Sequence, residues 1–370
     1  MTVAGPESAP SAAEPILEGL CPLLEQAGFP TAGAGSPRDG RQPAVTLYRL
    51  TTGGNNAVFR VDVPQRSLLL KHYFSDVRDD RDRMGAEVAF ARFLWEHGVR
   101  AIPQLLACSA ERRLALWEFV PGERLSPGAV TDAAVWQALD FCRQVFAIQT
   151  HPQAQSLALA AEASFSVHGH LACVDRRVGR LTQISAESAE QREVQQFAET
   201  ELAPCWRQVC DRVRRACQSA GVSGDTELPV PQRCLSPSDF GFHNALQEAD
   251  GRLRFLDFEY AGWDDPAKLI CDFFCQVEVP VPRRYLPEFA AAIAAAFPDS
   301  AALRRRSGWL LPVYRIKWCC IVLNEFLPAG RARRRFSAAD LRSDHQPSVQ
   351  LAKARRILEQ LRDDERESGV

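Results

Sequence analysis

Three oxygen-bearing side chains stand close together in one segment of the sequence, residues 235–266. Asp239, Asn244 and Asp257 follow one another at spacings of five and thirteen residues. Magnesium prefers hard oxygen ligands and is usually held by one or two carboxylates together with nucleotide phosphates, so Asn244 and Asp257 are candidate ligands. Asp239 is a candidate general base, because a nearby carboxylate can accept the proton of an attacking hydroxyl. The pattern points to phosphoryl transfer, although Asp239 could instead cap a turn and Asn244 could satisfy a loop.

An earlier set of residues could hold the phosphates of a nucleotide. Residues 52–56 read TGGNN, and paired glycines let backbone N–H groups approach a ligand closely, although this is also an ordinary hairpin turn. Lys71 lies in the apolar run SLLLKHY, where a lysine must find an anion or extend out to water. Glu87 follows sixteen residues later and is a natural counter-ion, although most helix glutamates are only solvated.

The composition limits the partners that the chain could have. Of its 370 residues, 46% are hydrophobic and 24% charged, which is enough for one or two domains with apolar cores and excludes disorder of the whole chain. The formal net charge of −2 gives no general attraction to nucleic acid or to an anionic membrane. Only four of the 44 basic residues are lysines, which suggests that arginine would not serve at some of these positions: Lys71, Lys268, Lys317 and Lys353.

The cysteines and the N-terminal sequence favour a cytoplasmic protein. The twelve cysteines include no CxxC pair, which favours reduced thiols packed as small hydrophobic side chains. The N-terminus has no basic segment followed by an apolar one, and Arg315 and Lys317 interrupt the apolar run around Cys319. We therefore expect neither a signal peptide nor a membrane span.

The pattern of apolar and polar residues along the chain predicts the elements that position these residues. Residues 1–14 are rich in Ala, Ser and Pro and predict a disordered lead, which a short apolar helix follows. A second helix is expected to end near Gly98, and the chain beyond residue 124 is mostly helical apart from a loop and a strand within 232–260. Five short apolar or alternating runs predict strands: 44–50, 57–63, 67–73, 102–109 and 113–120.

The ordered motifs resemble one family. The runs GGNNAVFRV, LLLKHYF, LWEFVPGERL, SDFGFHN and FLDFEYAGWDDP, together with the helix that carries Glu87, are similar to those of small-molecule kinases of the aminoglycoside phosphotransferase and choline kinase type. The resemblance covers about residues 45–275. It implies an α+β, bilobal, protein-kinase-like fold. A small antiparallel five-stranded lobe with one helix would span residues 15–120, and a larger, mainly helical lobe would span residues 121–370.

The resemblance also implies roles and cofactors. Asp239 would be the catalytic base, Asn244 and Asp257 the ligands of Mg²⁺, and Lys71, held by Glu87, the ligand of the ATP α- and β-phosphates. The connector at residues 117–120 would bind adenine through its backbone. The full set expected to bind ATP is Gly53, Gly54, Asn55, Asn56, Lys71, Glu87, Glu118 and Val120.

The sequence departs from the family pattern at two places. The family usually has His-Gly-Asp at the catalytic loop, whereas Pro237, Ser238 and Asp239 stand here. The aspartate usually found three residues after the proline of the DP pair is Leu269, with Asp272 nearby. The missing histidine supports the loop in the family and is not the base, so these departures leave the expected base and metal ligands in place.

The acceptor hydroxyl should be chosen by the helical lobe. Residues 283–335 hold eleven basic and three acidic residues, an excess that would repel a polycationic drug and favour a neutral or anionic acceptor, unless this is only a solvated face. Lys317 and Asn324 would share a helical face that forms either a buried polar pair or part of a pocket. Arg315 lies elsewhere on that helix, and the candidate acceptor residues are Glu259, Asp264, Lys317, Asn324 and Glu325.

The sequence thus predicts an ATP- and Mg²⁺-dependent phosphotransferase that acts on a hydroxyl of a small molecule, such as a sugar, an amino alcohol or a hydroxy acid. Two alternatives stay open: an aminoglycoside-modifying resistance kinase, and a non-catalytic nucleotide-binding module, which the missing loop histidine suggests. A protein kinase is disfavoured, because HRD, DFG and APE motifs do not occur in order.

Overall fold

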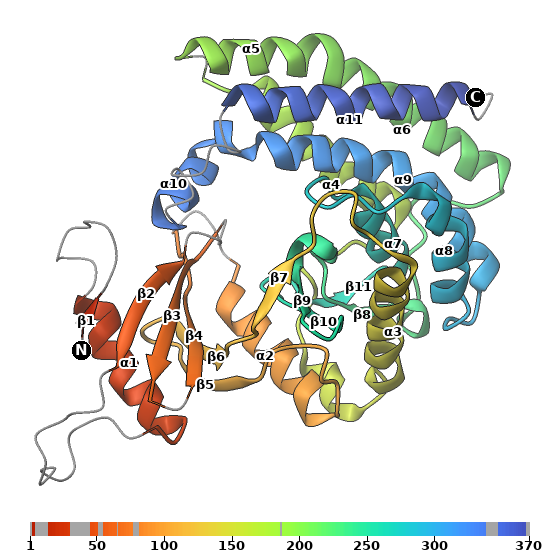
Figure 1. Cartoon of the computed structure of the whole chain (residues 1–370). Helices are drawn as coiled ribbons and strands as arrows, with labels where there is room; N and C mark the ends of the chain where they lie inside the picture. Colours follow the sequence, from red (N-terminus) through yellow and green to blue (C-terminus); the bar gives the residue numbers. More distant parts are fainter. Residues whose placement is uncertain are drawn as a thin grey trace, which may run out of the picture.

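The computed structural model divides the chain into a sheet-containing lobe and a helical lobe (Figure 1). Gly53 and Gly54, which we expect over the phosphates, lie outside the described residues. The described residues are 2–3, 14–29, 45–50, 55–64, 66–76, 81–185, 187–337 and 347–367.

The small lobe is built on the five predicted strands, which are confirmed. They pair antiparallel in the order β2-β3-β4-β6-β5, and the two-residue β1 (Thr2–Val3) adds to β2 in parallel. Part of the expected disordered lead is therefore an edge strand. The bounds are β2 (Thr46–Leu50), β3 (Ala57–Val63), β4 (Arg66–His72), β5 (Leu105–Ser109) and β6 (Leu114–Glu118).

Two helices accompany this sheet. α1 (Glu14–Gln26) packs on β5 and β6, and its leucines share an apolar core with alternate residues of β3 and β4. α2 (Arg83–Glu96) begins at Asp82, whose carboxylate accepts from the Gly85 N–H at 2.8 Å. It ends before Gly98, which has φ +87° in the left-handed region that glycine adopts at little cost, as predicted.

Strand alternation decides where the lysine of β4 points. Leu68 and Leu70 belong to the core beneath α1, whereas Leu69 and Tyr73 pack against the larger core that continues into the helical lobe. Because successive side chains of a strand point to opposite faces, Lys71 shares the face of Leu69 and Tyr73 and is turned toward the other lobe.

The helical lobe is centred on α9 (Ser300–Val322), which packs against α7 (Pro266–Cys275), α4 (Val167–Thr182) and α11 (Pro347–Glu367). In Figure 1, α11 runs alongside α9 on the outer side of this lobe. The remaining helices are α3 (Asp132–Ile148), α5 (Ala189–Phe197), α6 (Ala203–Ser219), α8 (Leu286–Ala294) and α10 (Pro328–Ser337). Among the described residues, no helix is both long and apolar enough to cross a membrane.

Five short strands form two small sheets next to the loops that carry Asp239 and Asp257. β7 (Gly122–Arg124), β9 (Ala245–Glu248) and β10 (Leu253–Phe255) form one small sheet, and β8 (Cys234–Ser236) pairs with β11 (Gly262–Asp264). The expected strand within 232–260 is confirmed as β10, but it is short because the chain turns sharply at Asp257, which has φ +67°.

The helix α10 joins the two lobes. The Phe336 ring lies 5.0 Å from the His72 ring and 5.3 Å from the Phe74 ring, measured between centroids. The Arg49 guanidinium donates to the Phe336 carbonyl at 2.7 Å. This part of the C-terminal half thus packs against the small lobe, a contact that the division at residue 120 does not anticipate.

Candidate active site

A buried lysine joins two carboxylates where the lobes meet. Lys71 Nζ on β4 lies 2.6 Å from Glu87 Oε2 on α2 and 2.5 Å from Asp257 Oδ1, which follows β10. The Asp257 side chain is 35% exposed, whereas the other two are almost fully buried. Glu87 Oε1 also accepts from the Phe258 N–H at 3.3 Å. The expected pairing of Lys71 with Glu87 is therefore present, and Asp257, which we expected to bind the metal, contacts the same lysine.

The charges of this group stabilise one another. Burial alone would lower the pKa of Lys71, but the carboxylates of Asp257 and Glu87 outweigh it and raise that pKa above its ordinary value. Burial raises the pKa of Glu87, and the Lys71 ammonium opposes that rise. The lysine is therefore a fixed positive charge where the two lobes meet.

The loop after β8 holds the candidate base in place. Asn244 Nδ2 donates to the Asp239 carbonyl at 2.9 Å and to Asp239 Oδ2 at 3.4 Å, and His243 Nε2 lies 3.3 Å from Asp239 Oδ1. Burial acts to raise the pKa of Asp239, but His243, Lys317 and the Asn244 amide together hold it below its ordinary value. Asp239 is thus an ionised carboxylate at neutral pH, which can accept a proton.

The hairpin of β9 and β10 brings the candidate metal ligands together. Ala245 pairs with Phe255, and the Leu256 N–H donates to the Asn244 carbonyl at 2.8 Å, so Asn244 and Asp257 lie at the same end of this hairpin. The Asn244 amide nitrogen is engaged by Asp239, which leaves its Oδ1 without a partner among the described residues.

This donor set fits magnesium. One amide oxygen and one partly exposed carboxylate are hard ligands of the number that Mg²⁺ takes from a protein when phosphates supply others. The described part of the chain contains no group of three or more His, Cys, Asp and Glu side chains that could hold a metal by themselves. A metal here would therefore depend on the nucleotide.

Glu259 differs from its expected role in binding the acceptor. Its two carboxylate oxygens accept from Asn55 Nδ2 at 2.6 Å and from Asn56 Nδ2 at 2.7 Å, and Arg83 NH1 lies 3.0 Å away. Glu259 and Arg83 are both buried. Glu259 therefore ties the end of the predicted phosphate loop and the start of α2 to the helical lobe. The side chains of Asn55 and Asn56, expected at ATP, are occupied in this contact.

Replacing Glu259 by Gln should reduce the free energy of unfolding by about 3 kcal/mol, because it removes the buried negative charge that accepts from Arg83, Asn55 and Asn56. Urea denaturation measures this. The matched control is Glu278→Gln, because Glu278 pairs with Lys353 at the surface, and its change should stay below about 1 kcal/mol. Equal losses in the two variants would show that Glu259 does not join the lobes.

The connector between the lobes carries the expected adenine-binding residues. Glu118 Oε2 accepts from Arg254 NH2 at 2.7 Å and from the Gln104 N–H at 3.0 Å, so its side chain fastens the connector to both lobes. The Val120 carbonyl accepts from the Gly122 N–H at 3.0 Å. The Val120 N–H has no partner in the described part of the chain and stays a candidate donor to a nucleotide base.

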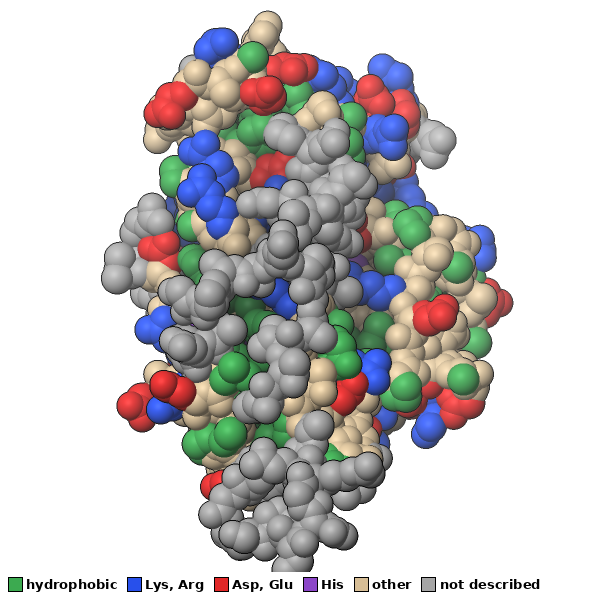
Figure 2. Space-filling view, turned by 60° about the vertical axis from the view of Figure 1, so that its left-hand side comes forward, with side chains coloured by type: hydrophobic (Ala, Val, Ile, Leu, Met, Phe, Trp, Pro, Cys, Tyr) green, Lys and Arg blue, Asp and Glu red, His purple; other side chains and the backbone are tan. Residues whose placement is uncertain are grey.

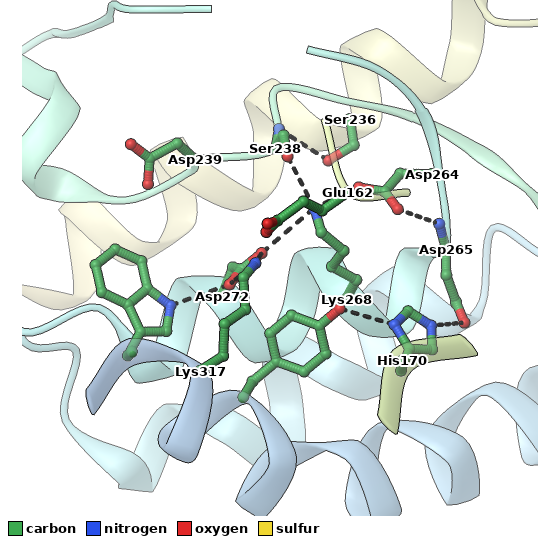
Figure 3. A network of polar contacts seen from close by, with 12 residues as sticks. Glu162, His170, Ser236, Ser238, Asp239, Asp264, Asp265, Lys268, Asp272 and Lys317 are labelled. Atoms are coloured by element: carbon green, nitrogen blue, oxygen red, sulfur yellow. Dashed lines mark hydrogen bonds and ion pairs between the residues drawn. The ribbon is translucent and has the colours of Figure 1, made fainter. Parts of the chain in front are cut away.

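A buried polar network lies behind the loop that carries Asp239 (Figure 3). Lys268 Nζ on α7 donates to Asp264 Oδ2 at 2.5 Å and to Ser238 Oγ at 2.8 Å. Lys317 on α9 lies 3.2 Å from Asp272 Oδ1. Asp264 and Lys317, expected at the acceptor, are therefore paired with other residues. The sequence left open whether Lys317 belongs to a buried polar pair or to a pocket, and the structure shows a buried pair with Asp272. The charge of Lys317 nevertheless helps to lower the pKa of Asp239.

The structure adds residues to the site that the sequence analysis missed. Lys268 had no expected role, although the scarcity of lysine was a signal that could have found it. His243 contacts Asp239, and its ring lies 5.8 Å from that of Trp318. Glu162, which pairs with Arg177 at 2.7 Å, lies in the same network, and no motif marks it in the sequence.

The remaining acceptor candidates are not brought to this site. α9 ends at Val322, so Asn324 and Glu325 lie in a 3₁₀ turn, and the Asn324 carbonyl accepts from the Leu327 N–H at 3.0 Å. Glu325 is buried and ion-paired with Arg334. In the described part of the chain, no contact joins these residues or Arg315 to Asp239, Asn244 or Asp257.

Part of the basic excess in residues 283–335 is balanced in the structure. Figure 2 shows basic and acidic side chains interspersed over the described part of the visible face. Sequence counting therefore overstated the positive charge available to select an acceptor. Four of the basic side chains pair with carboxylates from outside the stretch: Arg283 and Arg315 with Asp364, Arg306 with Asp265, and Lys317 with Asp272.

The fold and site together define a phosphotransferase of the two-lobed, protein-kinase-like class. The chain belongs to the phosphotransferase enzyme family, whose profile matches residues 46–309. A search of curated proteins finds no match.

Solved structures with this fold are similar to the chain over most of its length. A choline/ethanolamine kinase family protein from Mesorhizobium loti has a TM-score of 0.52 at 19% identity, covering 92% of this chain and 99% of its own. Choline kinase from Cryptosporidium parvum has a TM-score of 0.51 at 12% identity, with coverage of 93% and 97%. The AMP-bound spectinomycin phosphotransferase has a TM-score of 0.55 at 12% identity, with coverage of 90% and 98%.

Proposed function

We propose that this protein transfers the γ-phosphate of ATP to a hydroxyl of a small molecule, with Mg²⁺ as the metal. The observation that carries this proposal is the position of Lys71. It is a buried cation held between Glu87 and Asp257, and Asp257 shares one end of a hairpin with Asn244, which in turn binds Asp239. The residues proposed to bind phosphate, to bind the metal and to accept the proton therefore lie next to one another.

Each group has a role in this reaction. Lys71 would bind the α- and β-phosphates, and Asn244 Oδ1 and Asp257 would hold Mg²⁺, which neutralises the charge that develops on the phosphates. The acceptor oxygen forms a bond to the γ-phosphorus while the bond from that phosphorus to the bridging oxygen breaks. The electron pair leaves with ADP, and Asp239 takes the hydroxyl proton.

The acceptor class is proposed more broadly. A sugar, an amino alcohol or a hydroxy acid supplies the hydroxyl that Asp239 requires. The similar structures are those of choline or ethanolamine kinases and of a spectinomycin phosphotransferase, so choline, ethanolamine and spectinomycin belong in any acceptor panel. The mixed charges near Asp239, from Lys317, Asp272 and Glu162, favour no single sign of acceptor charge.

A screen for acceptor-dependent ADP release tests the proposal. The full chain is incubated with ATP and Mg²⁺ and with choline, ethanolamine, spectinomycin, a set of sugars and a set of hydroxy acids. At least one compound should raise ADP release above the rate with water alone, and removal of Mg²⁺ by EDTA should abolish the increase. ATP binding without release of ADP for any compound would support the non-catalytic module instead.

A further inference from the structure

The residue before the candidate base has an unusual backbone conformation. Ser238 has φ +65°, and Asp239 follows it directly. This left-handed region is energetically unfavourable for a residue with a Cβ, so such a residue adopts it only when surrounding contacts stabilise it. Ser238 is buried, and its N–H donates to Ser236 Oγ at 3.0 Å.

Lys268 supplies the contact that holds the side chain of Ser238. Its Nζ donates to Ser238 Oγ at 2.8 Å, and the same ammonium contacts Asp264 Oδ2 on β11 at 2.5 Å and Asp272 Oδ2 on α7 at 3.4 Å. Figure 3 shows Lys268 reaching from below toward Ser238, with Asp239 beyond it along the loop. Lys268 is therefore placed to transmit the position of α7 to the catalytic loop.

The chemistry of this contact explains why a lysine stands at position 268. A compact ammonium with three donors meets three oxygens converging from Ser238, Asp264 and Asp272, whereas the flat guanidinium of arginine is larger and fixed in its donor directions. Burial acts to lower the pKa of Lys268, but the carboxylates of Asp264 and Asp272 raise it above its ordinary value. The donor is therefore permanently charged.

We propose that Lys268 is a positioning residue, which holds Ser238 in the left-handed conformation and thereby aims the Asp239 carboxylate at the acceptor hydroxyl. This inference rests on the proposed function for its kinetic consequence. Its geometric consequence can be tested independently of turnover.

Paired substitutions at Ser238 separate the hydrogen bond from the backbone conformation. Ser238→Ala removes Oγ but keeps the Cβ that disfavours the left-handed region, so kcat should fall about 10- to 100-fold, as expected for a misplaced base. Ser238→Gly removes Oγ together with the strain, so it should lose only about threefold. KM for ATP should stay within about twofold in both variants.

A further variant connects the effect to the lysine. Lys268→Arg keeps the charge opposite Asp264 and Asp272, which protects folding, and should lower kcat about as much as Ser238→Ala. Adding Lys268→Arg to Ser238→Gly should cost less than about threefold more, because the glycine no longer needs the contact. Independent, full losses in the double variant would overturn the proposal.

Crystal structures of the two Ser238 variants give a readout without turnover. The glycine variant should keep the 2.9 Å contact from Asn244 Nδ2 to the Asp239 carbonyl, and the alanine variant should lose it together with the left-handed φ at residue 238. An unchanged loop in the alanine variant would overturn the positioning role. An inactive wild-type protein with the expected pair of crystal structures would instead contradict only the proposed function.

Discussion

Replacing Asp239 by Asn should lower kcat about 10²- to 10⁴-fold, which is the range expected when a positioned general base is lost. The amide keeps the size of the side chain but cannot accept the hydroxyl proton. ATP should still bind, because Lys71, Asn244 and Asp257 remain. Steady-state kinetics with an acceptor from the screen and calorimetric titration with ATP measure the two effects separately.

The matched control for this variant is Asp250→Asn. Asp250 lies in the turn of the same β9–β10 hairpin, where it pairs with Arg252 at the surface, 2.7 Å away. Its replacement should leave kcat within about twofold, since exposed pairs contribute little. If Asp239→Asn retained the turnover of this control, Asp239 would not be the base.

Replacing Lys71 by Arg should lower kcat/KM for ATP about 10²- to 10³-fold, the size of effect expected when one preorganised electrostatic contact to the reacting group is lost. The ammonium sits within 2.6 Å of both Glu87 and Asp257, so the larger planar guanidinium would have to displace one of them. Loss of the charge is not the cause here, because arginine keeps it.

Lys353→Arg is the control for the same chemical change at another lysine. Lys353 reaches the surface and pairs with Glu278 at 3.1 Å, away from the predicted nucleotide-binding residues. Both variants should melt within a few degrees of the wild-type protein if the fold is intact. Full activity of Lys71→Arg would show that the buried lysine does not contact the phosphates.

The elements of the small lobe could be predicted because their patterns are local. Five apolar or alternating runs gave five strands, and Gly98 marked the end of α2. Lys71 and Glu87 both lie in this lobe, so their pairing could also be predicted from the strand and the helix that follows it. The resemblance of the motifs to a known family added the order of the two lobes and the roles expected of their loops.

The contacts between distant segments could not be predicted from local patterns. Glu259 was assigned to the acceptor because the helical lobe was expected to build that site, but its partners Asn55 and Arg83 lie on the other lobe. Lys268 donates to Ser238 thirty residues away in the sequence. Nothing in the local sequence indicates the positive φ of Ser238, which we propose this contact stabilises.

Counting charge along the chain failed for a related reason. Four of the eleven basic residues in 283–335 pair with carboxylates from outside the stretch, for example Asp364 on α11, which pairs with Arg283 and Arg315. Net charge in a sequence segment is a property of the segment, whereas the potential at a site depends on everything packed around it.

The most direct measurement of the central claim is the transfer of labelled γ-phosphate from ATP to an acceptor identified in the screen. The wild-type chain should move the label to the acceptor hydroxyl in a one-to-one ratio with the ADP formed, and Asp239→Asn should move it at least about 100-fold more slowly. Release of the label only as inorganic phosphate, or equal transfer by the Asp239→Asn variant, would contradict the account.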